Sequence, residues 1–130
     1  MPYKRIAGSK REVAILLVTS RDTGRWVLPK GNLIFGTPPH RAAAIEAEEE
    51  AGVRGSIAKK PLGQYPYRKW LGPQRFEIAE VDVFALKVRK TLSKYKERDQ
   101  RERRWVGREE AAEMIDEPEL RELIRAAVLD

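Results

Sequence analysis

Residues 37–52 constrain the fold more than any other part of the chain, because both ends of a helix are marked within them. Alanine and glutamate fill most of positions 41–51, and both are strong helix formers. Thr37 is placed to cap this helix, and prolines are tolerated in a first turn whose amide hydrogens lack partners. Gly52 stands where a helix commonly ends in a left-handed residue. The sequence therefore predicts one helix that ends just before Gly52.

Extended segments lie on both sides of the predicted helix. Residues 13–18 are an apolar run rich in β-branched side chains, which is typical of a buried strand. A turn at 71–73 should join two long strands into a hairpin, and the polar residues 89–104 are predicted to form a loop. The predicted strands cover residues 11–20, 26–28, 56–67, 75–88 and 105–106.

Two further helices are predicted at the end of the chain, over residues 108–115 and 118–129. The second is amphipathic and should pack its apolar face on the sheet. Its apolar residues at helical spacing are Leu120, Leu123, Ile124 and Val128. Helices that flank a mixed sheet define an α/β layered domain. No repeat, low-complexity tract or linker interrupts the sequence, so residues 1–130 are predicted to form a single domain.

Composition narrows the classes of function. The 130 residues include no cysteine, which excludes disulfides and thiolate metal sites. The longest apolar run, residues 13–18, is too short for a membrane span or a signal-peptide core. No membrane association is therefore expected, and a reduced, cytoplasmic location fits. The net charge of +6 favours anionic partners such as phosphates or nucleic acids, although it could also be a solubilising surface.

The predicted central helix carries a cluster of carboxylates. At about 100° per residue, Glu46, Glu49 and Glu50 share one face, and Glu48 points the other way. Three converging carboxylates repel one another unless a cation neutralises them. Mg²⁺ is suited to this task, because it takes oxygen ligands and bridges carboxylates to substrate phosphates. The alternative is an ordinary solvated run of glutamates.

The context of these glutamates resembles the Nudix box. That motif has a glycine, five residues, a glutamate, seven residues, and then Arg-Glu-U-x-Glu-Glu-x-Gly-U, where U is a bulky aliphatic residue. The residues in register are Gly31, Glu46, Glu49, Glu50, Gly52 and Val53. The resemblance implies a Nudix-type α/β/α sandwich, with a mixed β-sheet between helices, and a metal-dependent phosphohydrolase that cleaves a diphosphate linkage.

Two charged positions of the motif differ in this chain, and Ala47 is smaller than the aliphatic residue that is usual at its position. Thr37 replaces the first glutamate and Ile45 replaces the arginine. In the family that arginine helps hold the glutamates in place by pairing with carboxylates, which an isoleucine cannot do. The two changes put the number of bound metals and the rate in doubt, but the three central carboxylates remain.

The resemblance also implies roles for the matching residues. Glu46 and Glu50 would be the main Mg²⁺ ligands, with Mn²⁺ as a possible substitute. Glu49 would be a further ligand, or the general base that deprotonates the attacking water. The backbone carbonyl of Gly31, or that of Lys30, would complete the metal site.

Within the family the chain looks most similar to the diphosphoinositol polyphosphate phosphohydrolases and their bacterial relatives, which often also accept diadenosine polyphosphates. A substrate with many phosphates needs cations from several separate segments. The residues predicted to bind it are Arg5, Ser20, Arg21, Lys30, Arg68, Lys69 and Arg101. The alternative for the basic ones is a solvated loop or hairpin tip. The expected partner is a small phosphorylated molecule, and the protein would be a monomer or homodimer.

Other readings stay open. A non-catalytic Nudix-fold sensor would keep the fold and the basic pocket, and the changes at Thr37 and Ile45 favour it. A basic nucleic-acid-binding domain would need no Mg²⁺, but the acidic helix would interrupt a continuous basic stripe. A pyrophosphohydrolase that acts on RNA 5′ ends would combine features of both.

Overall fold

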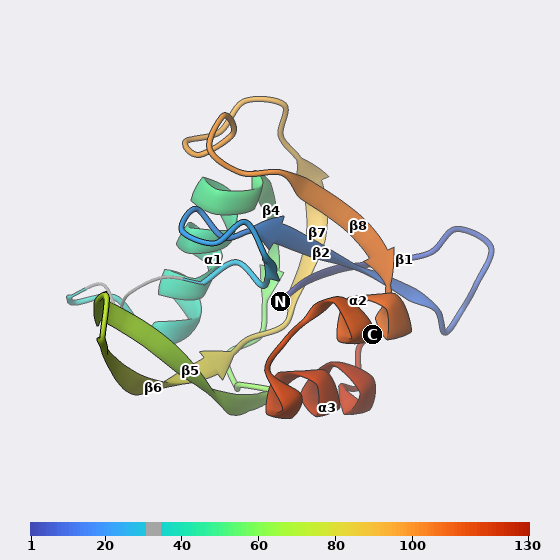
Figure 1. Cartoon of the computed structure of the whole chain (residues 1–130). Coiled ribbons are helices and arrows are strands. Elements are labelled where there is room, and N and C mark those ends of the chain that lie inside the picture. Colours follow the sequence, from blue (N-terminus) through green and yellow to red (C-terminus); the bar gives the residue numbers. More distant parts are fainter. Residues whose placement is uncertain (31–34) are drawn as a thin grey trace.

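The computed structural model describes residues 1–30 and 35–130. In that part of the chain the strands are β1 (Pro2–Arg5), β2 (Val13–Thr19), β3 (Trp26–Val27), β4 (Val53–Ile57), β5 (Gly63–Gly72), β6 (Arg75–Val83), β7 (Leu86–Thr91) and β8 (Arg103–Gly107). The helices are α1 (Pro39–Ala51), α2 (Arg108–Met114) and α3 (Pro118–Ala126). Figure 1 shows their arrangement.

The larger sheet is mixed. Its strands follow the order β3-β2-β1-β7-β4, and β8 also pairs with β2. The β1–β7 pair is parallel, and the other pairs of this sheet are antiparallel. The sequence did not predict β1, because its four residues carry little apolar signal of their own. Its position follows from distant partners: Tyr3 lies opposite Ile15 of β2 and Lys87 of β7.

Helices cover both faces of this sheet, which confirms the predicted α/β/α sandwich (Figure 1). β2 is buried through most of its length, and alternate residues point to opposite faces. Ile15 belongs to the core cluster that includes α2 and α3. Leu16 belongs to the cluster that includes Ala47 and Ala51 of α1. The continuous apolar run thus serves two cores, which explains why it does not alternate with polar residues.

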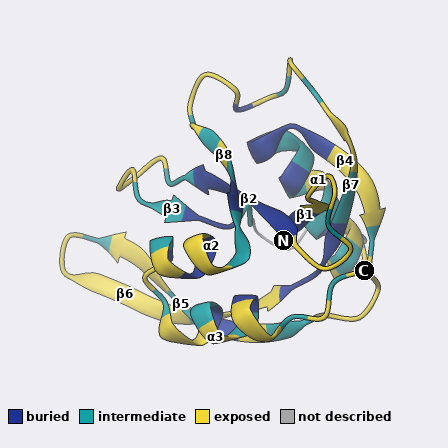
Figure 2. Ribbon diagram, turned by 90° about the vertical axis from the view of Figure 1, so that its right-hand side faces the viewer, coloured by how far each residue is buried: buried dark blue, intermediate teal, exposed yellow. Residues whose placement is uncertain are grey.

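The two long predicted strands are each divided in the structure. Residues 58–62, which include Pro61, separate β4 from β5, and residues 84–85 separate β6 from β7. The chain leaves the large sheet at the first break and returns to it at the second. Between them, β5 and β6 form a separate two-stranded hairpin. A proline cannot donate to a central ladder, so Pro61 is the local signal for the first break. Figure 2 shows how much of the hairpin is exposed.

The predicted central helix is confirmed as α1, but its predicted cap is wrong. The N-cap position is Pro38, and no side chain caps the helix there, so Thr37 does not have that role. Gly52 ends the helix with a φ of +66°, and its amide donates to the Glu48 carbonyl at 2.9 Å. Gly52 thus takes the left-handed conformation that the sequence predicted.

The C-terminal helices end slightly earlier than predicted. Leu120 and Ile124 are buried on α3 as expected. Val128 lies beyond the end of α3 and is 85% exposed, so the prediction that it packs on the sheet was wrong. Among the helices of the described residues, none has the length and apolar character that a membrane crossing requires.

Candidate functional site

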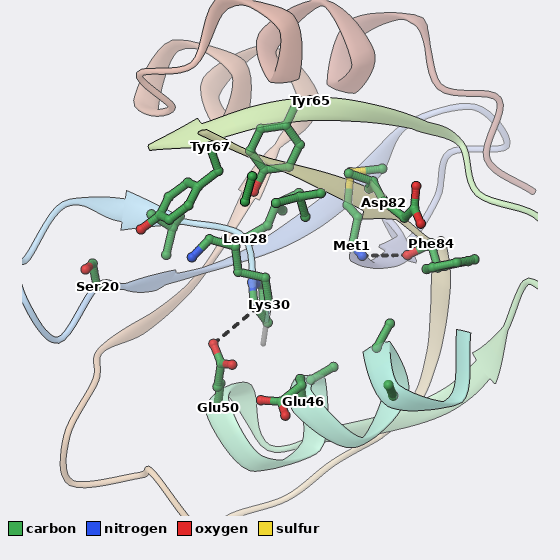
Figure 3. A pocket seen from close by; sticks show the side chains of 18 of the residues that line it. Met1, Ser20, Leu28, Lys30, Glu46, Glu50, Tyr65, Tyr67, Asp82 and Phe84 are labelled. Carbon is green, nitrogen blue, oxygen red and sulfur yellow. Dashed lines mark hydrogen bonds between the residues drawn. The ribbon is translucent and has the colours of Figure 1, made fainter. Parts of the chain in front are cut away.

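A cavity of about 800 Å³ is lined by residues of α1, of the β5–β6 hairpin, and of the segments that follow β2 and β3. Leu28 and the hairpin residues Tyr65 and Tyr67 form an apolar wall on one side. Glu46 and Glu50 of α1 form the opposite wall (Figure 3). The site therefore joins an aromatic surface to a pair of carboxylates.

The two carboxylates on this wall are one helical turn apart, so α1 presents them on the same side. Glu50 is only 4% exposed, and the backbone amide of Lys30 donates to its Oε1 at 3.3 Å. Burial, followed by a hydrogen bond with Glu46, raises the pKa of Glu50 to about 8, while Arg101 and the Lys30 amide oppose this shift. An acidic pair with one buried member is stabilised by a shared proton or by a bound cation.

Glu49, the third predicted member of this group, lies apart from the other two. Its Oε2 is 3.2 Å from Nζ of Lys96, and it does not line the cavity. Glu48 is on the other side of α1, where it pairs with Arg54 at 2.6 Å. Within residues 1–30 and 35–130, no three acidic or histidine side chains are close enough to hold one ion together. Gly31, the predicted backbone ligand, lies outside the described residues.

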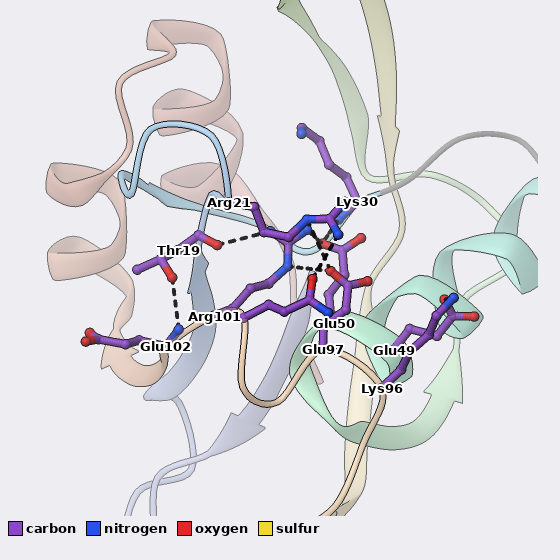
Figure 4. A network of polar contacts seen from close by, with 10 residues as sticks. Thr19, Arg21, Lys30, Glu49, Glu50, Lys96, Glu97, Arg101 and Glu102 are labelled. Carbon is purple, nitrogen blue, oxygen red and sulfur yellow. Dashed lines mark hydrogen bonds and ion pairs between the residues drawn. The ribbon is translucent and has the colours of Figure 1, made fainter.

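Sequence reasoning missed Glu97, which is 7% exposed and lines the cavity beside Glu50. Arg101 joins the two acids: its Nε is 2.9 Å from Glu97 Oε1, and its Nη2 is 3.7 Å from Glu50 Oε1. Arg21 lies 3.6 Å from Glu97 (Figure 4). The only local signal for Glu97 was its spacing of four residues from Arg101, in a segment predicted to be a polar loop.

The residues predicted to bind substrate divide into two groups. Those that line the cavity are Ser20, Arg21, Lys30, Lys69 and Arg101. Arg5 and Arg68 are not among the lining residues. Arg5 donates to the Lys10 carbonyl. The guanidinium of Arg68 instead lies 4.5 Å from the ring centre of Phe76.

Lys30 is the basic residue that lies closest to the aromatic wall. Its Nζ is 3.7 Å from the centre of the Tyr67 ring, a distance at which a cation is attracted to the face of the ring. Neighbouring residues of the hairpin alternate between faces. Lys69 therefore points with Tyr67 toward the cavity, whereas Arg68 points away.

The cavity is lined by more acidic than basic side chains. The acidic ones are Asp22, Glu46, Glu50, Glu77, Glu80, Asp82 and Glu97. The basic ones are Arg21, Lys30, Lys69 and Arg101. A polyanion that entered this cavity would be repelled by the carboxylates. Cations bound in the cavity would offset this repulsion.

Comparison with known proteins assigns the chain to a family. A model of the NUDIX domain matches residues 6–127. The chain belongs to the Nudix family. The match extends over nearly the whole chain and includes residues 31–53, which carry the resemblance to the Nudix box.

Several curated Nudix proteins are similar to this chain. Nudix hydrolase 12, mitochondrial, of Arabidopsis thaliana is 36% identical over 106 residues, which cover 79% of this chain and 52% of that protein. Nudix hydrolase 13, mitochondrial, of the same plant is 32% identical over 115 residues, covering 81% and 54%. The chain thus spans about half the length of these relatives. The mouse diphosphoinositol polyphosphate phosphohydrolase 3-alpha is 42% identical over 52 residues, covering 39% and 32%.

Solved structures support the same fold. The crystal structure of a C. elegans Ap4A hydrolase binary complex superposes with a TM-score of 0.66 and 21% identity. The match covers 95% of this Nudix chain and 88% of the other. At this level of identity the likeness concerns the fold.

Proposed function

We propose that this Nudix chain hydrolyses a diphosphate linkage in a small phosphorylated molecule, and that it depends on Mg²⁺ or Mn²⁺ to do so. The observation that carries the proposal is the burial of Glu50 beside Glu46 in the wall of an acid-lined cavity. Two carboxylates held this close repel one another unless they share a proton or a cation. The donor set therefore fits a hard divalent cation, which prefers oxygen ligands.

Glu46 and Glu50 would hold this cation, and the carbonyl of Gly31 stays a predicted further ligand. Mg²⁺ is commonly bound by one or two carboxylates together with waters and substrate phosphates, so the pair on the cavity wall is sufficient. A cation bound there would supply Lewis-acid polarisation of the phosphoryl group. The chain itself would hold the substrate phosphates with Lys30 and Lys69, whose side chains line the same cavity.

We propose that Glu49 is the general base or a third ligand of the cation. To act on a water in the cavity, its carboxylate would have to leave Lys96 and turn toward Glu50. The Lys96–Glu49 pair is partly exposed, with side-chain exposures of 69% and 32%, and such pairs are worth about 1 kcal/mol or less. An exchange of this partner on substrate binding is therefore inexpensive.

For the substrate we propose a diadenosine polyphosphate or a diphosphoinositol polyphosphate. Support comes from two similar proteins, the mouse diphosphoinositol polyphosphate phosphohydrolase and the C. elegans Ap4A hydrolase. The partly buried ring of Tyr67 in the cavity wall favours a substrate with a nucleobase, because an inositol ring offers no flat face to stack on it. A cytoplasmic location and a monomeric or homodimeric state remain predictions.

The test is a hydrolysis assay with Mg²⁺ across diadenosine polyphosphates, diphosphoinositol polyphosphates, nucleoside triphosphates, ADP-ribose and triphosphorylated RNA. Wild type is compared with Glu46→Gln, Glu50→Gln and Glu49→Gln. Glu48→Gln is the matched control, because Glu48 belongs to the same helix but pairs with Arg54 outside the cavity. We expect Glu50→Gln and Glu46→Gln to abolish turnover and Glu48→Gln to retain it.

Two other outcomes have distinct meanings. Folded wild-type protein that binds one of these compounds but never turns it over would contradict the enzyme proposal and favour a sensor, as the changes at Thr37 and Ile45 allow. Preference for triphosphorylated RNA would favour an RNA-end pyrophosphohydrolase. If Glu48→Gln lost as much activity as Glu50→Gln, the proposal that the carboxylates of the cavity wall hold the cation would be contradicted.

A further inference from the structure

The glutamates of α1 have no cationic partner within their own helix. At the position where the Nudix box has an arginine, Ile45 is 41% exposed. No basic residue occurs between Arg41 and the end of α1 at Ala51. Any cation that orients the carboxylates of the helix must therefore come from another part of the chain.

The loop between β7 and β8, residues 92–102, is fastened to the end of α1 that carries these glutamates. The backbone amide of Glu97 donates to the Glu49 carbonyl at 2.9 Å, and that of Leu92 donates to the Gly52 carbonyl at 2.7 Å. Immediately after the loop, Nη1 of Arg103 donates to the Ala51 carbonyl at 2.9 Å. Main-chain carbonyls that α1 leaves unpaired at its C-terminus are thus satisfied by this loop and its flank.

Two basic side chains of this loop contact the glutamates. Arg101 is the buried one, with a side chain that is 10% exposed. Besides its contacts with Glu97 and Glu50, its Nη1 donates to the Thr19 carbonyl at 3.0 Å. Lys96 is the exposed one, and it pairs with Glu49 (Figure 4). The planar fork of an arginine held at three points fixes the direction of the acids that it contacts.

We propose that the β7–β8 loop takes over the task of the arginine missing at Ile45. Arg101 is a positioning residue that holds Glu50 and Glu97 at the cavity, in place of the phosphate contact that the sequence suggested for it. Lys96 holds Glu49 outside the cavity, through a pair exposed enough to solvent to open when Glu49 acts. The inference rests on the proposed function only in that these carboxylates are taken to receive a divalent cation.

The sign of the change in Mg²⁺ affinity distinguishes positioning from simple charge. Arg101 is itself a cation, so its removal makes the cavity more negative, and Coulomb attraction alone would make Mg²⁺ bind more tightly. If Arg101 orients the ligands, its removal frees them to adopt other rotamers, and Mg²⁺ binds more weakly. Loss of an outer partner of a metal ligand typically costs roughly 10–100-fold in metal affinity or activity.

The experiment compares wild type, Arg101→Met, Arg101→Lys and the control Arg98→Met in the full chain. Arg98 is an exposed residue of the same loop. Mg²⁺ affinity is measured without substrate, by calorimetric titration and by the rise in unfolding temperature with Mg²⁺. We expect about 10–100-fold weaker binding for Arg101→Met, a smaller loss for Arg101→Lys, and no change for Arg98→Met. Unchanged or tighter binding by Arg101→Met would overturn the proposal.

Kinetics then separate positioning from substrate contact. A positioning role predicts a fall in kcat with little change in KM at saturating Mg²⁺, whereas a phosphate contact predicts a raised KM. The second pattern would overturn the proposal. If Arg101→Met fails to fold, Arg101→Lys decides: weakened Mg²⁺ binding supports positioning, and wild-type binding refutes it. If wild type binds Mg²⁺ with an affinity that depends on Arg101 but hydrolyses nothing, the proposed function fails and this inference survives. Wild type that binds no Mg²⁺ overturns both.

Discussion

Substitution of Gly52 by alanine should destabilise the protein for two separable reasons. Its φ of +66° is left-handed, and a residue with a Cβ atom loses about 1–2 kcal/mol in that conformation. A Cβ atom built there would also lie 2.3 Å from Cδ1 of Tyr95 and 2.7 Å from Nη1 of Arg103. Both side chains must therefore move. Because Arg103 donates to the Ala51 carbonyl, displacing it forfeits a charge-assisted hydrogen bond worth about 1.5–3 kcal/mol.

The expected loss for Gly52→Ala is thus about 2.5–5 kcal/mol in the free energy of unfolding. Gly24→Ala is the matched control, because Gly24 has a φ of +71° and no atom within 4 Å of the added Cβ. It should lose only the conformational part, about 1–2 kcal/mol. Urea denaturation measures both, and the midpoints should differ while the slopes agree.

Equal losses in the two variants would refute the steric part of this reasoning. A second check is the pair Gly52→Ala and Tyr95→Ala. If the ring of Tyr95 is the obstacle, the double variant should be more stable than the sum of the single losses predicts, by about 0.5 kcal/mol or more. Strict additivity would mean that the ring moves aside without cost.

Three further predictions concern other parts of the fold. Gly55→Ala should lower the unfolding temperature strongly, because the added Cβ would lie 1.9 Å from the backbone carbonyl of Lys87; a shift under two degrees would contradict this register. Leu120→Ala should cost about 2–5 kcal/mol, since this side chain is 1% exposed, and the kcat of the folded fraction should stay unchanged. Lys69→Ala should raise KM several-fold while Arg68→Ala does not, because only Lys69 lines the cavity; equal effects on KM would contradict the assignment of the two hairpin faces.

Local signals were sufficient to predict α1. Its composition and Gly52 lie within the segment itself, and the end that they predict is the end that the structure has. The same holds for the core strand β2, whose apolar run is continuous in sequence. In both cases the information that decides the structure is carried by neighbouring residues.

Elements that depend on distant partners could not be predicted in this way. β1 is a strand because β2 and β7 pair with it on either side. The break at residues 84–85 exists because β6 pairs within the hairpin and β7 pairs with β4. Helical periodicity likewise put Glu49 and Glu50 on one face, but it could not predict which partner each would meet. Lys96 and Arg101 come from a loop more than 40 residues away along the chain.

The charge of the protein and the charge of its cavity have opposite signs, which suggests that binding has two stages. The chain carries a net charge of +6, yet acidic residues outnumber basic ones in the cavity lining. Outside the cavity the field of the whole protein attracts a polyanionic substrate, and this attraction is screened by salt beyond about 10 Å at 0.1 M. Inside, nearby carboxylates oppose the same substrate unless cations accompany it. Added salt should therefore weaken substrate capture, whereas added Mg²⁺ should strengthen the step that follows it.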